Sequence, residues 1–226
     1  GSYRRGKDPV GDLDILVTAN SDSPVMQKFV QYDEVVDVVS KGATRATVYL
    51  RCGIQVDVRV VAKQNLGSAL HYFTGSKAHN IQLRRIAQKH GLKINEYGVF
   101  KGERRIAGET EESVFRSVGL VYIPPELREG RGEIEQARHK RLPELITIDD
   151  LQGDLHVHTT ASDVHASVEQ MAMAARDFGL KYIAITDHTK SLTIAHGLDE
   201  KRLQKQLDEI DRLNDKLKGI TILKSS

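Results

Sequence analysis

The chain has 226 residues, enough for one large domain or two smaller ones, and 28% of its side chains are charged while only 5% are aromatic. It holds no run of about eighteen apolar residues, so we expect no membrane-spanning helix and no membrane partner. The single cysteine, Cys52, excludes an internal disulfide and suits a reducing cytoplasm, where we expect the protein to reside. The net charge of +2 is too small to indicate nucleic-acid binding by itself.

The first segment, residues 1–62, predicts a mixed α/β structure. Residues 12–17 form a short apolar strand that carries two carboxylates, and residues 24–41 fit a helix followed by a valine-rich strand. Residues 45–51 and 54–61 alternate between apolar and polar side chains, as in half-buried strands, and Cys52-Gly53 is the predicted turn between them.

The hydrophobic period then changes to that of helices. Ser76 is suited to cap a helix that Gly91 ends, and residues 111–118 predict a second short helix. A charged connector rich in glycine and proline follows, and 133–142 also fit a helix. From 151 a strand–helix–strand–helix–strand rhythm predicts a parallel sheet or barrel with right-handed crossovers. The expected domains are therefore 1–62, 63–130, a linker at 131–150, and 151–226.

The paired carboxylates of the first strand predict a cation site. Asp12 and Asp14 are two residues apart in a strand, so both side chains project from one face. Antiparallel pairing would bring Asp57, on the polar face of a later strand, beside them. Three such carboxylates can hold two divalent ions for displacement at phosphorus. The alternative is that Asp12 and Asp14 are ordinary solvent-facing residues of an edge strand.

The residues before this strand favour a phosphate ligand over that alternative. Gly1-Ser2 and Arg4-Arg5 offer a hydroxyl, backbone N–H groups and guanidinium forks, which bind phosphate oxygens well. Gly11 lets the backbone approach a ligand closely.

A second group of polar residues predicts another metal site. His156 and His158 stand at one strand end, Asp163 follows, and Asp187-His188 closes the next parallel strand. Residues at the carboxyl ends of parallel strands converge on one rim, and histidine with carboxylate suits Mn²⁺, Zn²⁺ or iron.

The first two thirds of the chain resemble the family X DNA polymerases, relatives of DNA polymerase beta. The resemblance covers about residues 1–130 and rests on motifs in the family's order: GSYRRG at 1–6, GDLDIL at 11–16, VDVR at 56–59, YFTGS at 72–76 and INEY at 94–97. It implies that Asp12, Asp14 and Asp57 bind two Mg²⁺ or Mn²⁺ ions. Asp57 would also accept the proton of a primer 3′-OH.

The resemblance also implies roles for the residues around these carboxylates. Ser2 and Arg5 would hold the β- and γ-phosphates with help from the Gly11 backbone. Residues that would contact the incoming nucleotide or its base pair are Tyr72, Phe73, Gly75, Asn80 and Arg84. Arg59 and Glu96 resemble an ion pair tied to opening and closing. Taken singly, Tyr72 and Phe73 fit plain core aromatics, Asn80 and Arg84 a solvated helix face, and Arg59 with Glu96 an ordinary cross-strand pair.

Basic residues gather between 77 and 105, among them Lys77, Arg84 and Arg85, and acidic residues lie just beyond. Such a stretch can neutralise DNA phosphates, although a solvated helix face would look similar.

The segment from 151 resembles the polymerase and histidinol phosphatase (PHP) domain, a distorted (βα) barrel with a multinuclear metal centre. The matching residues are 156–159, 162–163 and 185–188. By this resemblance the ligands of Mn²⁺ or Zn²⁺ are His156, His158, Asp163 and His188, and Asp187 orients its neighbour. Val164-His165 stands where the family usually has glycine, so His165 is either an additional ligand or simply exposed.

We therefore expect an α/β protein: a nucleotidyltransferase palm with a thumb, then the first βαβαβ part of a PHP barrel, as a fragment of a longer gene product with weak or no activity alone. The expected function is DNA-directed DNA synthesis in gap filling or base-excision repair by a monomer. Its partners would be a deoxynucleoside triphosphate and gapped or primer–template DNA, with a 3′-5′ exonuclease-like second site. The alternatives are a metal-dependent phosphoesterase that uses the palm as a DNA platform, and a non-catalytic scaffold for DNA ends.

Overall fold

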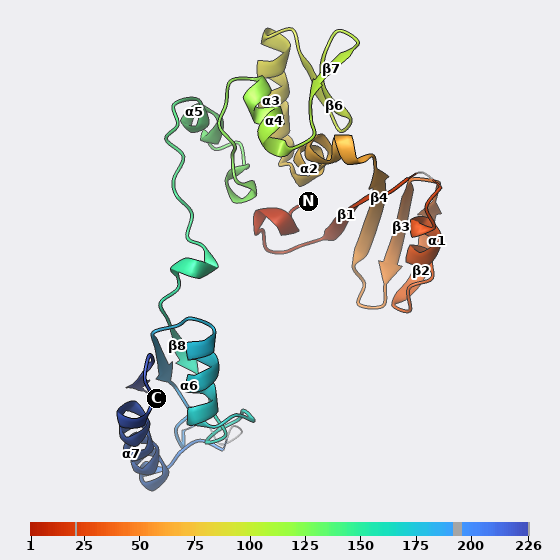
Figure 1. The fold of residues 1–226 in the computed structure, drawn as a ribbon. Helices are drawn as coiled ribbons and strands as arrows, with labels where there is room; N and C mark the ends of the chain where they lie inside the picture. The colour runs from red at the N-terminus through yellow and green to blue at the C-terminus, as the bar shows by residue number, and fades with distance from the viewer. Residues whose placement is uncertain (21, 192–195, 226) are drawn as a thin grey trace. The chain divides into compact units, whose positions relative to one another are not determined.

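The computed structural model describes residues 1–20, 22–191 and 196–225, and it divides the chain into two compact units (Figure 1). Unit 1 is Gly1–Pro143 and unit 2 is Glu144–Ser226. Within the described residues, no helix combines the length and apolar character that a bilayer crossing requires.

Unit 1 begins with a 3-10 turn, η1 (Tyr3–Arg5), and a four-stranded sheet whose strand order is β1-β4-β3-β2. Its elements are β1 (Asp12–Thr18), α1 (Val25–Val30), β2 (Val35–Lys41), β3 (Arg45–Leu50) and β4 (Gln55–Val61). Met26 of α1 is buried against Val48, Val56 and Val58, so one face of the sheet forms a core. The alternation predicted for residues 54–61 is confirmed by this division of faces.

The two strands that carry the three aspartates run in the same direction. Strand β1 pairs with β4 in parallel, with Asp14 opposite Asp57, so the antiparallel pairing expected from the sequence was wrong. The physical reason is the connection: β2 and β3 intervene, and this crossover lets β4 return parallel to β1. The predicted turn at Cys52-Gly53 is confirmed, since the Gly53 N–H donates to the Leu50 carbonyl at 2.8 Å.

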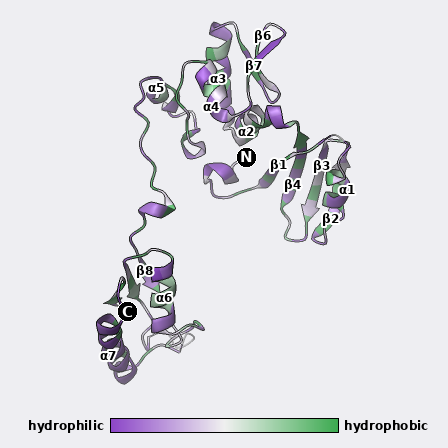
Figure 2. Cartoon of the chain, in the orientation of Figure 1, coloured by the Kyte–Doolittle hydropathy of each residue, from purple (hydrophilic) through white to green (hydrophobic). Residues whose placement is uncertain are grey.

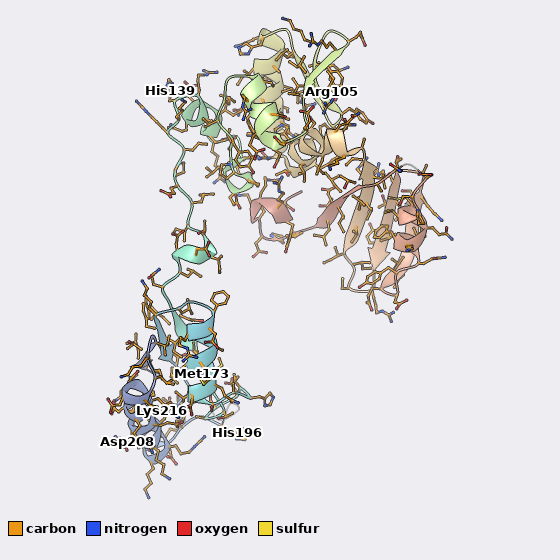
Figure 3. All side chains as sticks on the ribbon, viewed as in Figure 1. Arg105, His139, Met173, His196, Asp208 and Lys216 are labelled. Atoms are coloured by element: carbon orange, nitrogen blue, oxygen red, sulfur yellow. The ribbon has the colours of Figure 1, made fainter. Side chains whose placement is uncertain are left out.

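The rest of unit 1 combines helices with a small antiparallel sheet of order β5-β6-β7. Its elements are η2 (Lys63–Asn65), α2 (Leu66–Thr74), α3 (Lys77–Lys89), β5 (Lys93–Asn95), β6 (Gly98–Lys101), β7 (Arg104–Ala107), α4 (Glu111–Ser117), η3 (Pro125–Leu127) and α5 (Glu133–Arg138). Leu83, Phe115 and Ile123 lie at the centre of its core. As predicted, Ser76 caps α3, because its hydroxyl accepts from the His79 N–H at 3.3 Å. Figure 3 labels Arg105 at the β6–β7 hairpin.

Unit 2 is a three-stranded parallel sheet of order β10-β9-β8 with two helices. Its elements are η4 (Ile148–Asp150), β8 (Gly153–Val157), α6 (Val168–Asp177), β9 (Tyr182–Ile185), α7 (Glu200–Lys216) and β10 (Thr221–Lys224). The predicted βαβαβ rhythm is confirmed. Ser167 and Gln170 form a capping box at the start of α6. Figure 2 shows α7 mostly in hydrophilic colours, and Ile210 and Leu213 are the apolar residues that it buries.

Candidate functional sites

The aspartates of unit 1 lie on the sheet face that α1 leaves uncovered. Leu13 and Val56 are register partners that contact the apolar core, so the alternating side chains of Asp12, Asp14 and Asp57 face the other way. Asp12 is exposed, Asp14 is half-buried and Asp57 is only 6% exposed. Register therefore makes Asp14 and Asp57 direct neighbours, with Asp12 further toward the start of β1.

Asp57 is held by three side chains that sequence reasoning did not place beside it. Its Oδ1 accepts from Thr47 Oγ1 at 2.7 Å and from Arg45 Nη2 at 2.9 Å, and its Oδ2 accepts from Gln55 Nε2 at 2.9 Å. Burial acts to raise the pKa of this carboxyl, but the hydrogen bonds from Thr47, Arg45 and Gln55 outweigh it, so the pKa lies below its ordinary value. Asp57 is therefore an ionised carboxylate in a fixed orientation.

The first residues of the chain lie against Asp14. The Gly1 nitrogen is 3.4 Å from Asp14 Oδ2, and a Cβ at position 1 would come within 2.7 Å of the same oxygen. The Ser2 carbonyl accepts from the Arg5 and Lys7 N–H groups, which folds the segment into a tight turn. Gly11 is exposed just before β1. The structure thus brings the predicted phosphate-binding motif to the aspartate pair.

The two arginines of that motif contact the end of α2 and the thumb segment beyond it. Arg5 Nε donates to Glu129 Oε1 at 2.7 Å, and Arg5 Nη1 donates to the Thr74 carbonyl. Arg4 donates to Thr74 Oγ1 at 2.7 Å and to both carboxylate oxygens of Glu111. In the sequence nothing distinguishes Glu111 and Glu129 from ordinary surface acidic residues. No local pattern indicates that they bind arginines more than a hundred positions earlier.

A cleft of about 550 Å³ opens beside the aspartates. It is lined by Gly1, Tyr3, Arg4, Asp12, Leu13, Asp14, Ile15, Leu16, Leu70, Phe73 and Thr74. The motif residues of η1, two of the three aspartates and Phe73 of α2 therefore share one cavity. Its mixture of carboxylates, an arginine and apolar walls suits a charged ligand with a flat or apolar part.

The aromatic pair and the first turns of α3 lie close together. The Tyr72 and Phe73 rings meet edge to face with centroids 5.0 Å apart, and Gly75 ends α2 with a φ of 73°. Asn80 Nδ2 donates to the Tyr72 carbonyl at 2.9 Å, and Asn80 is buried rather than part of a solvated face. Its Oδ1 has no hydrogen-bond partner, which leaves one acceptor free.

Arg59 and Glu96 line the same pocket. Both line a cavity of about 200 Å³ together with Phe73 and Tyr97. The Arg59 guanidinium lies 4.5 Å from the Phe73 ring centroid, a cation–π arrangement. Among the ion pairs of the described residues none joins Arg59 to Glu96, so the expected pair is not formed in this structure.

Three of the predicted DNA-binding residues point to solvent from α3. Lys77, Arg84 and Arg85 are exposed, and Arg84 Nε also donates to the Asn80 carbonyl at 3.2 Å. Lys77 and Arg85 are therefore accessible to phosphate groups. Arg84 connects this exposed surface to the backbone of the buried Asn80.

The second cluster lies at the carboxyl ends of β8 and β9 in unit 2. His158 follows β8, Asp163 lies in the next loop, and His188 follows β9. One ligand atom from each of these three residues lies within 4.8 Å of the other two, and no other set of histidine, cysteine or acidic residues does so in the ranges the structure describes. His156 Nε2 is 2.9 Å from His158 Nε2, so the fourth predicted ligand adjoins the cluster. His165 is exposed and outside it.

The donor set of this cluster fits a divalent metal ion. His158 Nδ1 is buried with no hydrogen-bond partner and lies 3.5 Å from Asp163 Oδ1, while His188 Nε2 is 3.5 Å from Asp163 Oδ2. Two imidazoles facing one carboxylate at distances too long for good hydrogen bonds leave room for a shared cation. Nitrogen with oxygen ligands suits Zn²⁺ or Mn²⁺.

Unit 1 joins a sheet that carries carboxylates to a helical segment with exposed basic side chains. Unit 2 is a parallel α/β unit with a histidine–aspartate cluster. This combination defines a nucleotidyltransferase-like protein with an added domain that has a candidate metal site. Family models agree: the DNA polymerase beta thumb matches residues 69–129, and the PHP domain matches residues 154–220.

Three curated relatives point the same way. The chain is 38% identical over 231 residues to DNA polymerase/3'-5' exonuclease PolX of Bacillus subtilis, an alignment that covers 99% of this chain and 40% of that protein. It is 38% identical over 78 residues to human DNA-directed DNA/RNA polymerase mu, covering 33% of this chain and 16% of the relative. DNA polymerase lambda of Rattus norvegicus is 28% identical over 160 residues, covering 57% and 28%.

A solved structure shares the fold of part of the chain. The crystal structure of Leishmania infantum polymerase beta in a ternary P/T complex matches with a TM-score of 0.50 and 25% identity, over 57% of this chain and 65% of that one. The chain is thus similar to family X DNA polymerases in its first part, and its second part matches the PHP domain. It spans 40% or less of the length of the three curated relatives.

Proposed function

We propose that the chain holds the catalytic palm, the thumb and PHP-domain residues of a DNA polymerase that fills gaps during DNA repair. The observation that carries this proposal is the register of β1 and β4, which sets Asp14 directly beside Asp57 with Asp12 on the same face. Carboxylate oxygens in this arrangement suit Mg²⁺ or Mn²⁺. When bound, two such ions supply charge neutralisation for displacement at phosphorus.

In this proposal the chain's own residues divide the work at the palm. Asp12 and Asp14 hold the triphosphate side of the site, and Asp57, already ionised and oriented, accepts the proton of the primer 3′-OH. Ser2, Arg5 and the Gly11 backbone bind the β- and γ-phosphates, for which Arg5 exchanges Glu129 for phosphate oxygens.

The remaining residues position the nucleotide and the DNA. Tyr72, Phe73 and Gly75 pack against the incoming sugar, and the free Oδ1 of Asn80 accepts from the minor-groove side of the new pair. Arg84 extends that contact, Lys77 and Arg85 bind phosphates without regard to sequence, and Arg59 moves to Glu96 as the site closes.

A second activity is proposed for unit 2 because His158, Asp163 and His188 gather their ligand atoms. With His156 they would hold Mn²⁺ or Zn²⁺ in a phosphoesterase that removes nucleotides or phosphate from DNA 3′ ends. A metal-bound site of this kind activates water for attack at phosphorus.

The test uses the complete gene product on DNA with a one-nucleotide gap. Asp57→Ala is expected to abolish nucleotide addition and to spare removal of 3′ ends, while His156→Ala has the opposite effect. Asp37→Ala, an exposed aspartate of β2 in the same sheet, is the matched control and leaves both activities unchanged. Nucleotide addition that survives Asp57→Ala would refute the assignment of the palm.

A further inference from the structure

Asp187, next to His188 in the chain, is a buried carboxylate with every acceptor position filled. Its oxygens accept from the Thr159 N–H at 2.7 Å and from Thr159 Oγ1, Ser162 Oγ and Gln206 Nε2 at 2.5 Å each. A carboxylate offers about four lone-pair positions, so four donors saturate it. In this structure Asp187 is therefore fully engaged by groups of the chain itself, next in sequence to His188 of the cluster.

The partners of Asp187 control the loop that carries Asp163. Thr159 Oγ1 donates to Asp187 and accepts from the Ala161 N–H at 3.1 Å, and the Thr159 carbonyl accepts from the Ser162 and Val164 N–H groups. Thr159 thus fixes both ends of the short turn that presents Asp163.

Ser162 lies between two carboxylates. Its Oγ is 2.5 Å from Asp187 Oδ1 and 3.0 Å from Asp163 Oδ1, but a hydroxyl has one proton to donate. The shorter bond assigns that proton to Asp187. Asp163 then faces the cluster without that proton, so its carboxylate oxygens remain available as acceptors.

One of the four hydrogen bonds to Asp187 comes from helix α7, through Gln206, whereas the other three come from the loop after β8. Gln206 is 5% exposed and faces Asp187, whereas Asp208 and Lys216 on the same helix are exposed (Figure 3). One turn earlier, Arg202 donates to the carbonyls of Ala161 and Gly197, which lie in the segments after β8 and β9. The first half of α7 is thus tied to both loops of the cluster.

We propose that Gln206 is a positioning residue that sets the metal affinity of the His158–Asp163–His188 cluster through its hydrogen bond to Asp187. This inference rests on the proposed metal site of unit 2 and extends it to a helix that carries no ligand. The amide group is essential because it donates to Asp187. Asp187 also accepts hydrogen bonds from Thr159 and Ser162, which belong to the turn that presents Asp163. A carboxylate at position 206 would repel Asp187 and loosen the turn that presents Asp163.

The experiment measures Mn²⁺ binding to the 226-residue chain by the electron paramagnetic resonance of the free ion. His188→Ala identifies the share of binding that belongs to this cluster, since the palm aspartates also bind Mn²⁺ in our proposal. Gln206→Glu is expected to weaken that share by up to about 10-fold, the lower end of the range for direct partners of metal ligands, because Gln206 acts through Asp187. Gln206→Met, which removes the donor without adding charge, weakens it by a smaller factor.

The control is Gln204→Glu, an exposed residue two positions earlier on α7, which leaves Mn²⁺ binding unchanged. Helix content by circular dichroism and the metal-free Tm are measured for every variant, and Gln206→Met carries the test if the glutamate variant fails to fold.

Two results would overturn the inference in different ways. If His188→Ala removes a class of Mn²⁺ sites but neither Gln206 variant weakens that class, the positioning role is wrong and the metal site stands. If His188→Ala removes no binding, the metal site proposed for unit 2 is itself wrong, and the role of Gln206 fails with it.

Discussion

Arg45 and Asp57 form an ion pair across two neighbouring strands, with Arg45 Nη2 2.9 Å from Asp57 Oδ1. The arginine side chain is 52% exposed and the aspartate side chain 9% exposed, so a solvated cation orients a nearly buried anion. Before any metal ion binds, this guanidinium is the positive group that faces the proposed general base.

Replacing Arg45 by methionine is expected to raise the pKa of Asp57 toward its ordinary value and to destabilise unit 1 slightly. Arg45 is one of the groups that hold this pKa below its ordinary value despite burial. A group whose pKa is lowered by folding stabilises the native state above its unfolded pKa, and this contribution is lost as the pH falls through the folded pKa. Because Arg45 is half exposed, the effect at pH 7 is about 0.2–1 kcal/mol.

Urea unfolding of the wild type and Arg45→Met across the acid range measures this contribution. The difference in midpoint is expected to shrink as the pH falls below about 4, where the unfolded aspartate takes up a proton. Arg51→Met removes a more exposed arginine that pairs with Glu34 at one end of the same sheet, and it serves as the control. A difference between Arg45→Met and wild type that does not change with pH would show that the pair acts through packing alone.

The sequence predicts the parts of the palm that depend on local pattern. The alternation of residues 54–61 assigns Asp57 to the polar face of β4, and that face is where the structure has it. The direction of β4 relative to β1 is not a local property, because it depends on how β2 and β3 occupy the space between them. The partners Thr47 and Arg45 follow from the β3–β4 register, which the chain fixes only on folding.

In unit 2 a general rule was sufficient to predict that His158, Asp163 and His188 lie close together. Parallel strands place their carboxyl ends at one edge, so two histidine-bearing strand ends had to approach each other. The rule says nothing about α7, and neither Gln206 nor Arg202 carries a pattern that distinguishes it from other polar residues of an amphipathic helix. Contacts such as Arg4 with Glu111, which are 107 positions apart, are equally invisible to local periodicity.

Replacing Glu111 by glutamine is expected to destabilise unit 1 strongly. Glu111 Oε1 accepts from Arg128 Nη1 at 2.5 Å, and Arg128 is completely buried with its Nη2 lacking any partner. Loss of the carboxylate leaves a buried guanidinium without a counter-charge, which costs about 3–5 kcal/mol. Glu112→Gln, at the exposed neighbour, changes the same net charge and should alter the free energy of unfolding by less than about 0.5 kcal/mol.

Urea unfolding at pH 7 compares the two glutamine variants directly. Equal stabilities would mean that water reaches Arg128 in solution and that the buried pair contributes little.

His71 is expected to make unit 1 less stable as the pH falls below about 6.5, the ordinary pKa of histidine. Both of its ring nitrogens are buried without hydrogen-bond partners, and its ring lies 5.6 Å from that of His79. Burial, followed by the proximity of His79 and Arg128, holds the pKa of His71 well below its ordinary value. Between the two pKa values the unfolded chain therefore binds a proton that the folded chain does not. The free energy of unfolding keeps its full value above the unfolded pKa of His71 and decreases as the pH falls toward the folded pKa.

The free energy of unfolding between pH 7.5 and pH 5 measures this loss, which approaches about 1.4 kcal/mol per pH unit for one proton. His71→Leu should flatten the slope, with a remainder from His79, whose pKa is also lowered, mainly by burial. His90→Leu, at the exposed residue that follows α3, should leave the slope unchanged. An unaltered slope in His71→Leu would assign the acid sensitivity to other groups.

Replacing Gly67 by alanine is expected to destabilise unit 1 although alanine favours helices. Gly67 lies in α2 where that helix meets the start of α4, and a Cβ would fall 2.2–2.4 Å from the Thr110 backbone. Helix propensity would contribute about 1 kcal/mol in favour of alanine. Contacts this short with backbone atoms force the two helices apart, and overpacking of this kind costs typically 1–3 kcal/mol, here toward the upper end.

Thermal unfolding separates the two effects, because Gly42→Ala provides a position with space for the methyl group. The added Cβ there would be 3.5 Å from the Arg45 carbonyl oxygen, an ordinary contact. Gly67→Ala should lower the Tm and Gly42→Ala should leave it nearly unchanged. Since α2 ends in the residues that contact Arg4 and Arg5, displacement of α2 should also reduce the affinity of the chain for a nucleoside triphosphate. A Gly67→Ala variant as stable as the wild type would show that α2 and α4 pack less closely than their backbones indicate.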